Sequence, residues 1–527
     1  MSSDTSRKNV FTQGPLPLTL LKTALPIILV MSMNGLLTVA DAVFLGRFVG
    51  PDALSAVTLM FPAYMLLVAM ATLVSNGMNS ILARNLGGGH VDGARSVFSG
   101  AHGLALCTGA GAIVLFSAVG YPIILIAAEG SEPIAGMAYT YLAITVWTSP
   151  LLFVLSVQTG ALRSEGFVMQ MAGVSLLVSL ANIVFNFVLV AILKLGVAGT
   201  AYGTALAQLL TFAVVILFRL RAKTVLKPGT LLSYPLTAHW WSIFALGAPQ
   251  SLNFAGIALS SAATFASLQY FGQEGYEATV AAFGIVTRIM TFVFLPLLGL
   301  TQALQAMIGN NYGAGEWKRS DDTLRLGLLT AFVYCLGAQT LLTVFARPVG
   351  FLFVNDLQVT SELSRIMPIT VALMFAAGPL FVIAAYFQAL GDAMRAALIS
   401  LIKPYFFFLP LLIALPAFFG ETGIWLASPA AEFLLVVLTA AILGVNRQKE
   451  NAALGFVCCI HCKNERLGSC RRSLCSAGTV QLPGRYLPVS GSRTSFAPRP
   501  LGSAFAAAFE IWFSTSAILR LTRWTIQ

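Results

Sequence analysis

A single aspartate interrupts an apolar stretch near the start of the chain, in GLLTVADAVFLGRF at residues 35–48. Asn34 and Thr38 precede Asp41 by seven and three residues, so in a helix the three side chains would share one face. A carboxylate inside a membrane is costly and usually has a function, such as proton or ion binding. Because apolar surroundings disfavour its charged form, we expect Asp41 to take up a proton near neutral pH.

Other polar residues occur in later apolar segments at helical spacing. They are Asn182 and Asn186 in LANIVFNFVLV, Thr200 and Thr204 in GVAGTAYGTALAQ, and Tyr139 and Tyr141 near the end of a further segment. If the N-terminus is cytoplasmic, Asp41, Asn186 and Thr204 lie about 6 to 11 Å below the outer edge of their helices. Four helices could thus present polar groups at one depth and form a proton or cation site.

A purely structural interpretation of these residues competes with the functional one. Asp41 lies near the end of its segment and could reach the membrane interface, while Asn and Thr side chains in membrane helices often bond to neighbouring helices. However, we find no other carboxylate well inside the first six apolar segments. In the second half, Glu432 is the main comparable acid, and Arg288 and Lys403 are candidates for buried cations. The isolation of Asp41 favours the functional interpretation.

Composition identifies the surroundings of these residues. Of 527 residues, 57% are hydrophobic and only 10% are charged, whereas soluble domains are about 25% charged. Mean hydropathy is +0.83. Apolar segments long enough to cross a bilayer occur at 24–45, 53–80, 97–120, 136–161, 168–193, 197–220, 241–270, 277–307, 323–346, 365–390, 394–417 and 421–445. The sequence therefore predicts a polytopic, all-α membrane protein with twelve transmembrane helices.

Basic residues in the connections predict the orientation of these helices, because cytoplasmic loops carry an excess of Lys and Arg. With the N-terminus and the even-numbered loops inside, the cytoplasmic side has fourteen Lys and Arg residues and the outer side four. We therefore expect a multi-pass protein of the plasma (inner) membrane with both termini in the cytoplasm.

The two halves of the chain resemble each other at an offset of roughly 223 to 228 residues. ALPIILVMSMNG at 24 weakly matches GAPQSLNFAGIA at 247, and ARNLGGGHVDGAR at 83 matches GNNYGAGEWKRSD at 309 more clearly. GALRSEGF at 160 parallels QALGDAMR at 388. An even number of spans per copy predicts two six-helix lobes in the same orientation, related by a pseudo-two-fold axis along the membrane normal. We place the N-lobe at 1–222, the C-lobe at 223–446 and the linker at 219–240.

Residues 447–527 differ from the rest of the chain. They contain five of the seven cysteines and, by our count, 11 Lys and Arg against 3 Asp and Glu, so most of the net charge of +11 lies here. The basic composition thus gives no reason to expect a nucleic-acid partner. CCIHC lacks the paired spacing of a structural zinc site, so we expect no metal. We predict a disordered cytoplasmic tail, with an accidental reading frame as the alternative origin.

Four motifs resemble the multidrug and toxic compound extrusion (MATE) transporters over residues 15–446. They are ARNLGGG, GNNYGAG, ALRSEG and LGVAGTAYGTALAQ, and together with the twelve-helix duplication they are most similar to the prokaryotic DinF-like branch. The resemblance implies that Asp41 is the helix-one aspartate of an N-lobe cation site. It assigns to the same site Asn182, Asn186, Thr204, and either Tyr139 or Tyr141. Pro26 matches a helix-one proline associated with bending, and a proline inside a helix permits a kink.

The sequence departs from the family pattern in both lobes. The family commonly has an aspartate where this chain has Asn186, so one carboxylate of the site is missing. A single negative charge compensates a sodium ion less well, which favours proton coupling. In the second lobe, QSLNFAGIALSSAATF and AAGPLFVIAAYFQ contain no acidic residue, so a NorM-like sodium site is not expected there.

We therefore interpret the chain as a secondary active antiporter that exports amphipathic organic cations in exchange for protons, with sodium less favoured and no cofactor. Protonation of Asp41 would change its hydrogen bonds and bend helix one at Pro26. The nearest rival is a lipid-linked oligosaccharide flippase, for which Arg288 and Lys403 could supply the required basic groups. A major facilitator transporter is disfavoured because the loop after helix two lacks the D-R-x-G-R pattern. An enzyme is not expected, since neither G-x-x-x-x-G-K-[ST] nor H-E-x-x-H occurs.

Overall fold

The computed structural model describes residues 9–450, apart from 50, 129–130, 223, 272–275 and 355. For some helical residues only the backbone is described. These residues are 34, 36–48, 51–55, 58–59, 61, 127, 276 and 443–450. The predictions for the tail concern residues almost all of which lie outside this part. The described chain contains helices and no strand, as the sequence predicts for an all-α membrane protein.

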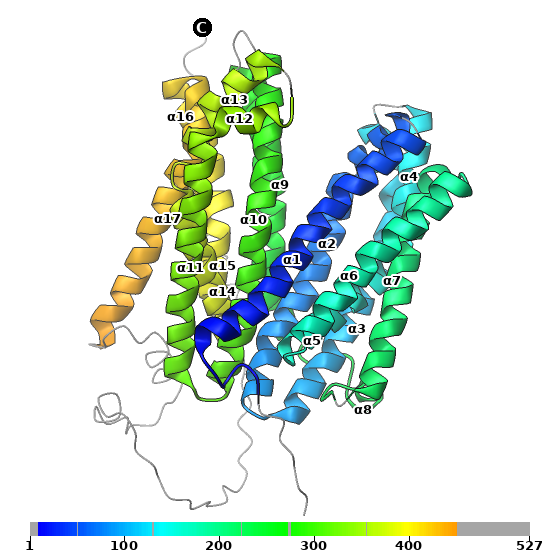
Figure 1. The fold of residues 1–527 in the computed structure, drawn as a ribbon, viewed down its shortest axis with the longest axis vertical. Helices are drawn as coiled ribbons and strands as arrows, with labels where there is room; N and C mark the ends of the chain where they lie inside the picture. Colours follow the sequence, from blue (N-terminus) through cyan, green and yellow to red (C-terminus); the bar gives the residue numbers. More distant parts are fainter. Residues whose placement is uncertain are drawn as a thin grey trace, which may run out of the picture. The chain divides into compact units, whose positions relative to one another are not determined.

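The N-lobe contains the first seven α-helices and one π-helix (Figure 1). They are α1 (Leu16–Phe48), α2 (Pro51–Gly87), α3 (Val91–Ala127), α4 (Glu132–Trp147), α5 (Ser149–Ser164), α6 (Val168–Asn186), η1 (Phe187–Ile192) and α7 (Gly196–Arg221). The short helix α8 (Thr230–Ser233) lies in the linker that follows.

The C-lobe continues from α9 to α17 (Figure 1). Its elements are α9 (Trp240–Phe271), α10 (Tyr276–Gly313), α11 (Trp317–Val344), α12 (Ala346–Phe351), α13 (Leu357–Thr370), α14 (Met374–Leu390), α15 (Ala393–Ile402), η2 (Lys403–Phe408), α16 (Leu409–Phe419) and α17 (Glu421–Glu450).

The twelve predicted spans are present, but two of them are broken. Ten helical segments are long and apolar enough to cross a membrane, and two bent pairs complete the twelve. The segment predicted at 136–161 bends by 48° between α4 and α5, and the segment predicted at 365–390 bends by 51° between α13 and α14. Pro150 opens α5 and Pro368 lies in the last turn of α13, and a proline removes a backbone hydrogen bond and clashes with the preceding turn.

The two lobes pack through repeat-related helices, with α2 along α9 and α1 along α10. Glycines let the first pair approach closely. A Cβ atom on Gly77 would lie 1.9 Å from the carbonyl oxygen of Ile243, and one on Gly247 would lie 1.8 Å from that of Leu73. We call the end of the bundle that holds the linker and the loops 88–90 and 314–316 the linker end.

Hydrogen bonds at the linker end join the lobes in a symmetric pattern. The Arg84 guanidinium donates to the carbonyl oxygen of Ala389 at 2.8 Å, and the Asn310 amide donates to that of Ser164 at 3.3 Å. Arg84 and Asn310 occupy equivalent positions in the two sequence repeats, and their acceptors Ser164 and Ala389 lie in the last turns of α5 and α14. Side chains of each lobe thus bind the backbone of the other.

A buried ion pair fixes the start of the linker to the N-lobe. Arg219 Nη1 lies 2.8 Å from Glu165 Oε2, and these side chains are 0% and 2% exposed. The same guanidinium donates to the carbonyl oxygen of Leu226, while Glu165 Oε1 accepts from the backbone N–H groups of Val225 and Leu226. Each charge is therefore matched by an opposite charge and by backbone groups of the linker.

We predict that Arg219→Met destabilises the protein, because Glu165 would remain buried without its counter-charge. Removing one partner of a buried pair typically costs about 3 to 5 kcal/mol. The thermal unfolding midpoint of the purified protein in detergent measures this. The control is Arg95→Met, whose side chain is 39% exposed and whose carboxylate partner lies 3.5 Å away. Equal midpoints for the two variants would contradict the prediction.

Candidate functional site

A hydrogen-bonded polar cluster joins α6 to α7 inside the N-lobe. Asn186 Nδ2 donates to Asn182 Oδ1 at 3.1 Å, and Asn182 Nδ2 donates to Thr204 Oγ1 at 2.8 Å. The Thr204 hydroxyl in turn donates to the carbonyl oxygen of Thr200 at 3.0 Å. Asn182 and Asn186 are 2% and 0% exposed. The structure thus brings together the three residues that the sequence predicts for this side of the site, and we call them the N-lobe cluster.

Two local features of the backbone accommodate the N-lobe cluster. Gly203 lies against Asn186, and a Cβ atom at this position would be 2.1 Å from Asn186 Oδ1. The π-helix η1 begins directly after Asn186. Such π-helical turns occur within α-helices mostly as single turns at functional sites. Gly203 therefore leaves space for Asn186. A larger side chain at this position of α7 would displace the asparagine.

The tyrosines of α4 lie in different surroundings. Tyr139 stacks on Phe116 with ring centroids 5.3 Å apart and meets Tyr121 edge to face. Tyr141 instead lines a small cavity with Thr204. Successive helix positions two apart point in different directions, so only one of these tyrosines can face the cluster. The contacts favour Tyr141.

The small cavity beside Thr204 contains residues that the sequence reasoning missed. Its volume is about 20 Å³, enough for one water-sized guest. The other lining residues are Tyr64, Thr145, Thr148, Leu152, Ala201 and Gln208. Gln208 follows Thr204 by one turn in GTALAQ, so helical periodicity could have identified it. Tyr64 belongs to α2, and no local sequence signal places it here.

The three candidate residues of α1 are described by their backbone only. Asn34, Thr38 and Asp41 belong to α1, but their side chains lie outside the described part of the structure. The helix itself packs beside α6 and also contacts η1 and α7. The backbone that carries Asp41 therefore belongs to the helix that borders the elements of the N-lobe cluster.

The equivalent helices of the C-lobe are joined by an ion pair instead. Lys403, the first residue of η2, donates to the carboxylate of Glu432 on α17. The two side chains are 27% and 6% exposed. Glu432 is thus neutralised by a built-in cation. Arg288 differs from the expectation of burial, since it is exposed on α10. Among the described residues, no group of three or more His, Cys, Asp or Glu residues could hold a metal ion.

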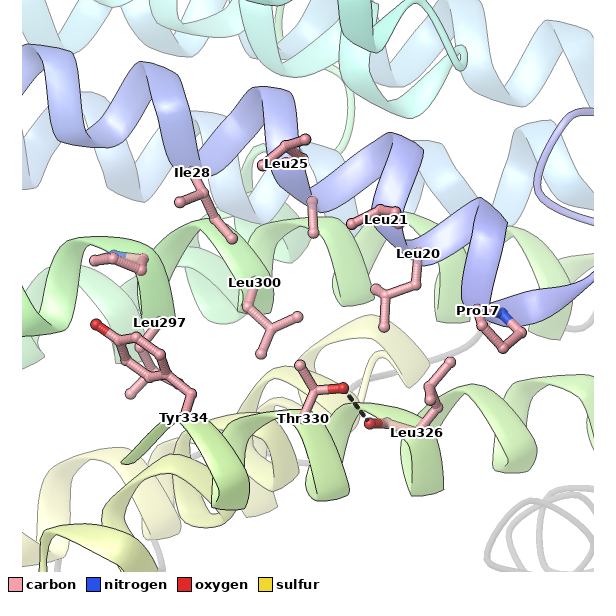
Figure 2. A pocket seen from close by; sticks show the side chains of 12 residues that line it. Pro17, Leu20, Leu21, Leu25, Ile28, Leu297, Leu300, Leu326, Thr330 and Tyr334 are labelled. Atoms are coloured by element: carbon pink, nitrogen blue, oxygen red, sulfur yellow. Dashed lines mark hydrogen bonds between the residues drawn. The ribbon is translucent and has the colours of Figure 1, made fainter. Parts of the chain in front are cut away.

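Pro26 lies buried in the interior of α1, and a larger cavity borders the residues around it. The cavity has a volume of about 360 Å³ and lies between α1, α10 and α11 (Figure 2). Its lining is almost entirely apolar, as Leu21, Leu25 and Leu300 illustrate, and the Tyr334 hydroxyl donates to the carbonyl oxygen of Val293. None of the N-lobe cluster lines it, so the cavity is separate from that site.

We predict that Gly203→Ala lowers the thermal unfolding midpoint, because the new Cβ atom would push Asn186 away from Asn182. The matched control is Gly173→Ala on α6, where nothing lies within 4 Å of the added atom. Alanine is favoured over glycine in a helix by roughly 1 kcal/mol, so the control should be neutral or stabilising. Equal behaviour of the two variants in a detergent melting assay would show that the close contact is unimportant.

We also predict that the C-lobe ion pair behaves as a unit. Lys403→Met leaves Glu432 buried without compensation and should lower the melting temperature of the protein. The double variant Lys403→Met with Glu432→Leu removes both charges and should recover most of the loss. Additive losses in this double-mutant cycle would contradict a direct interaction between the two side chains.

Comparison with known proteins gives a family match and several relatives of this chain. The MatE family model matches residues 26–188 and 249–412, once in each lobe. Multidrug export protein MepA from Staphylococcus aureus is 24% identical over 83% of this chain and 96% of its own length. A protein named FAD transporter from Shewanella oneidensis is 27% identical over 80% of this chain and 93% of its own length.

Solved structures share the same fold. A multidrug resistance MATE family transporter of the MOP superfamily, in an outward-facing conformation, superimposes with a TM-score of 0.73 and 21% identity. The match covers 82% of this chain and 96% of that structure. With a family model that matches both lobes, the chain belongs to the MatE family, the multidrug and toxic compound extrusion transporters.

Proposed function

We propose that this protein is a DinF-like antiporter that exports amphipathic organic cations in exchange for protons. The observation that carries the proposal is the difference between the lobes. The N-lobe joins its fifth and sixth spans through neutral Asn and Thr side chains, beside a helix that carries the isolated Asp41. The C-lobe pairs its buried acid with Lys403. The N-lobe is therefore the better place for a carboxylate that gains and loses a proton.

In this mechanism Asp41 binds either the proton or the cationic cargo. Protonation changes its hydrogen bonds to the N-lobe cluster and to Tyr141, removes its negative charge and weakens the attraction for the cargo. Pro26 then allows α1 to bend, because no backbone N–H is available at that position. Cargo and proton must differ in affinity between the two access states, since otherwise the exchange would not be coupled.

The alternation of access requires the contacts at the linker end to break and reform. In the described part of the chain, several side chains join the lobes at this end by binding backbone carbonyl groups, among them Arg84 and Asn310. We place the linker end in the cytoplasm, because it carries the excess of basic residues. Both described ends of the chain lie there, since α1 begins and α17 ends at this side of the bundle (Figure 1). The lobe boundaries at 222 and 446 belong to the same proposal.

Two alternatives are less well supported. A sodium ion would gain less electrostatic compensation from one carboxylate than from two, and Asn186 is neutral. A lipid-linked oligosaccharide flippase would need basic residues in the central cavity; of the two candidates, Lys403 is paired with Glu432, which leaves Arg288. The names of the relatives include both multidrug export and FAD transport.

We predict that a proton gradient drives efflux of a fluorescent cationic dye from vesicles and that Asp41→Asn lowers this efflux at least tenfold. The same vesicles receive an imposed sodium gradient in a parallel experiment. The control is Asp322→Asn, whose carboxylate is 38% exposed and pairs with Arg325 at 3.5 Å. Efflux that follows sodium alone, or that survives Asp41→Asn, would disprove proton coupling at this aspartate.

A further inference from the structure

Arg288 is a charged residue inside a membrane-spanning segment. It lies 12 residues after the start of α10 at Tyr276 and 25 residues before the end at Gly313. Its side chain is exposed. Among the described residues, the seven ion pairs do not include it. A charged side chain at such a position usually faces the bundle interior or a water-filled space and has a functional partner.

The contacts of α10 show which way Arg288 faces. A Cβ atom on Gly35 of α1 would lie 2.6 Å from the Leu295 side chain and 3.5 Å from that of Phe292. One turn further along, a Cβ atom on Gly299 would lie 2.9 Å from Ile28. Positions 288, 292, 295 and 299 recur every three to four residues and share one helix face. Arg288 therefore continues the stripe of α10 that contacts the N-lobe.

Along this stripe, the packing against α1 gives way to exposed surface. Gly299 is buried and Leu295 is half-buried, whereas Phe292 and Arg288 are exposed. Figure 1 shows α9 and α10 on the side of the C-lobe nearest to α1 and α2. Arg288 therefore lies on the lobe-facing side of α10, beyond the last described contact with α1.

Arg288 and Asp41 lie at similar levels along their antiparallel helices. Asp41 follows Gly35 by six residues, and Arg288 precedes Phe292 and Leu295 by four and seven residues. At about 1.5 Å of rise per residue, both residues lie roughly 6 to 10 Å beyond the same contact. Asp41 of the N-lobe and Arg288 of the C-lobe thus lie at a common depth.

We propose that Arg288 is a specificity-determining residue that binds an oxyanion of the cargo. The planar guanidinium matches the geometry of carboxylate and phosphate groups, which it binds through two parallel hydrogen bonds. The preferred cargo is then an amphipathic molecule with a cationic group for Asp41 and a carboxylate or phosphate group for Arg288. The inference rests on the proposed function, because Asp41 is assigned to the cation.

The test compares two rhodamine dyes that differ in one charge, a free carboxylate and its methyl ester, in vesicles with an imposed proton gradient. The wild type should transport the carboxylate dye in preference to the ester. Arg288→Gln should lower transport of the carboxylate dye at least tenfold and change that of the ester less than twofold. Arg288→Lys keeps the charge without the planar geometry and should give an intermediate value. Arg325→Gln, which removes a cation that is 60% exposed, should change neither dye.

Several outcomes would overturn the inference. Equal losses for both dyes in Arg288→Gln would indicate a structural role. If Arg288 binds lipid phosphate instead, the loss of transport in Arg288→Gln would depend on the lipid rather than on the dye. A comparison of phosphatidylcholine vesicles with vesicles that contain phosphatidylglycerol detects this outcome. If the proposed function itself is wrong, the results differ from these. The wild type would then transport neither dye, or Asp41→Asn would leave transport of the ester unchanged.

Discussion

A charged or strongly polar group inside a membrane must find a partner within the protein, because the lipid offers none. This constraint explains the arrangement of the polar residues in the described helices. The amide and hydroxyl groups of Asn182, Asn186 and Thr204 bind one another, and Glu432 binds Lys403. These pairs join the same two spans in each lobe. Arg288 forms no ion pair with the described residues, and we infer that a ligand supplies its partner.

The internal duplication places this chemistry on a symmetric frame. The helix pairs α2 with α9 and α1 with α10 repeat the same packing across the lobes. Hydrogen bonds from Arg84 and Asn310 follow the same symmetry. The contacts between the fifth and sixth spans break this symmetry, since the N-lobe has neutral Asn and Thr side chains there and the C-lobe has the Lys403–Glu432 ion pair. The two lobes can therefore move in similar ways although their charges differ. In our proposal, only the N-lobe responds to a proton.

The sequence alone predicts much of the fold, because composition, span length and the repeat depend on local properties of the chain. Helical spacing also brings Asn182 and Asn186 to one face. The partner of Glu432 could not be predicted, since Lys403 is 29 residues away and belongs to another helix. Likewise, the choice between Tyr139 and Tyr141 depends on helix rotation, which is set by tertiary packing. The bends after Trp147 and Thr370 depend on prolines whose effects vary with their neighbours, since Pro26 and Pro249 lie inside helices that continue.

The central claim is that one carboxylate exchanges a proton for the cargo. The most direct measurement is proton release from the purified protein, in weakly buffered detergent solution near neutral pH, when a cationic dye is added to saturation. The account predicts release of up to about one proton per protein, with the largest value where Asp41 is protonated before the dye binds, and no release from Asp41→Asn. Dye binding by the wild type without proton release, or unchanged release from the variant, would contradict it.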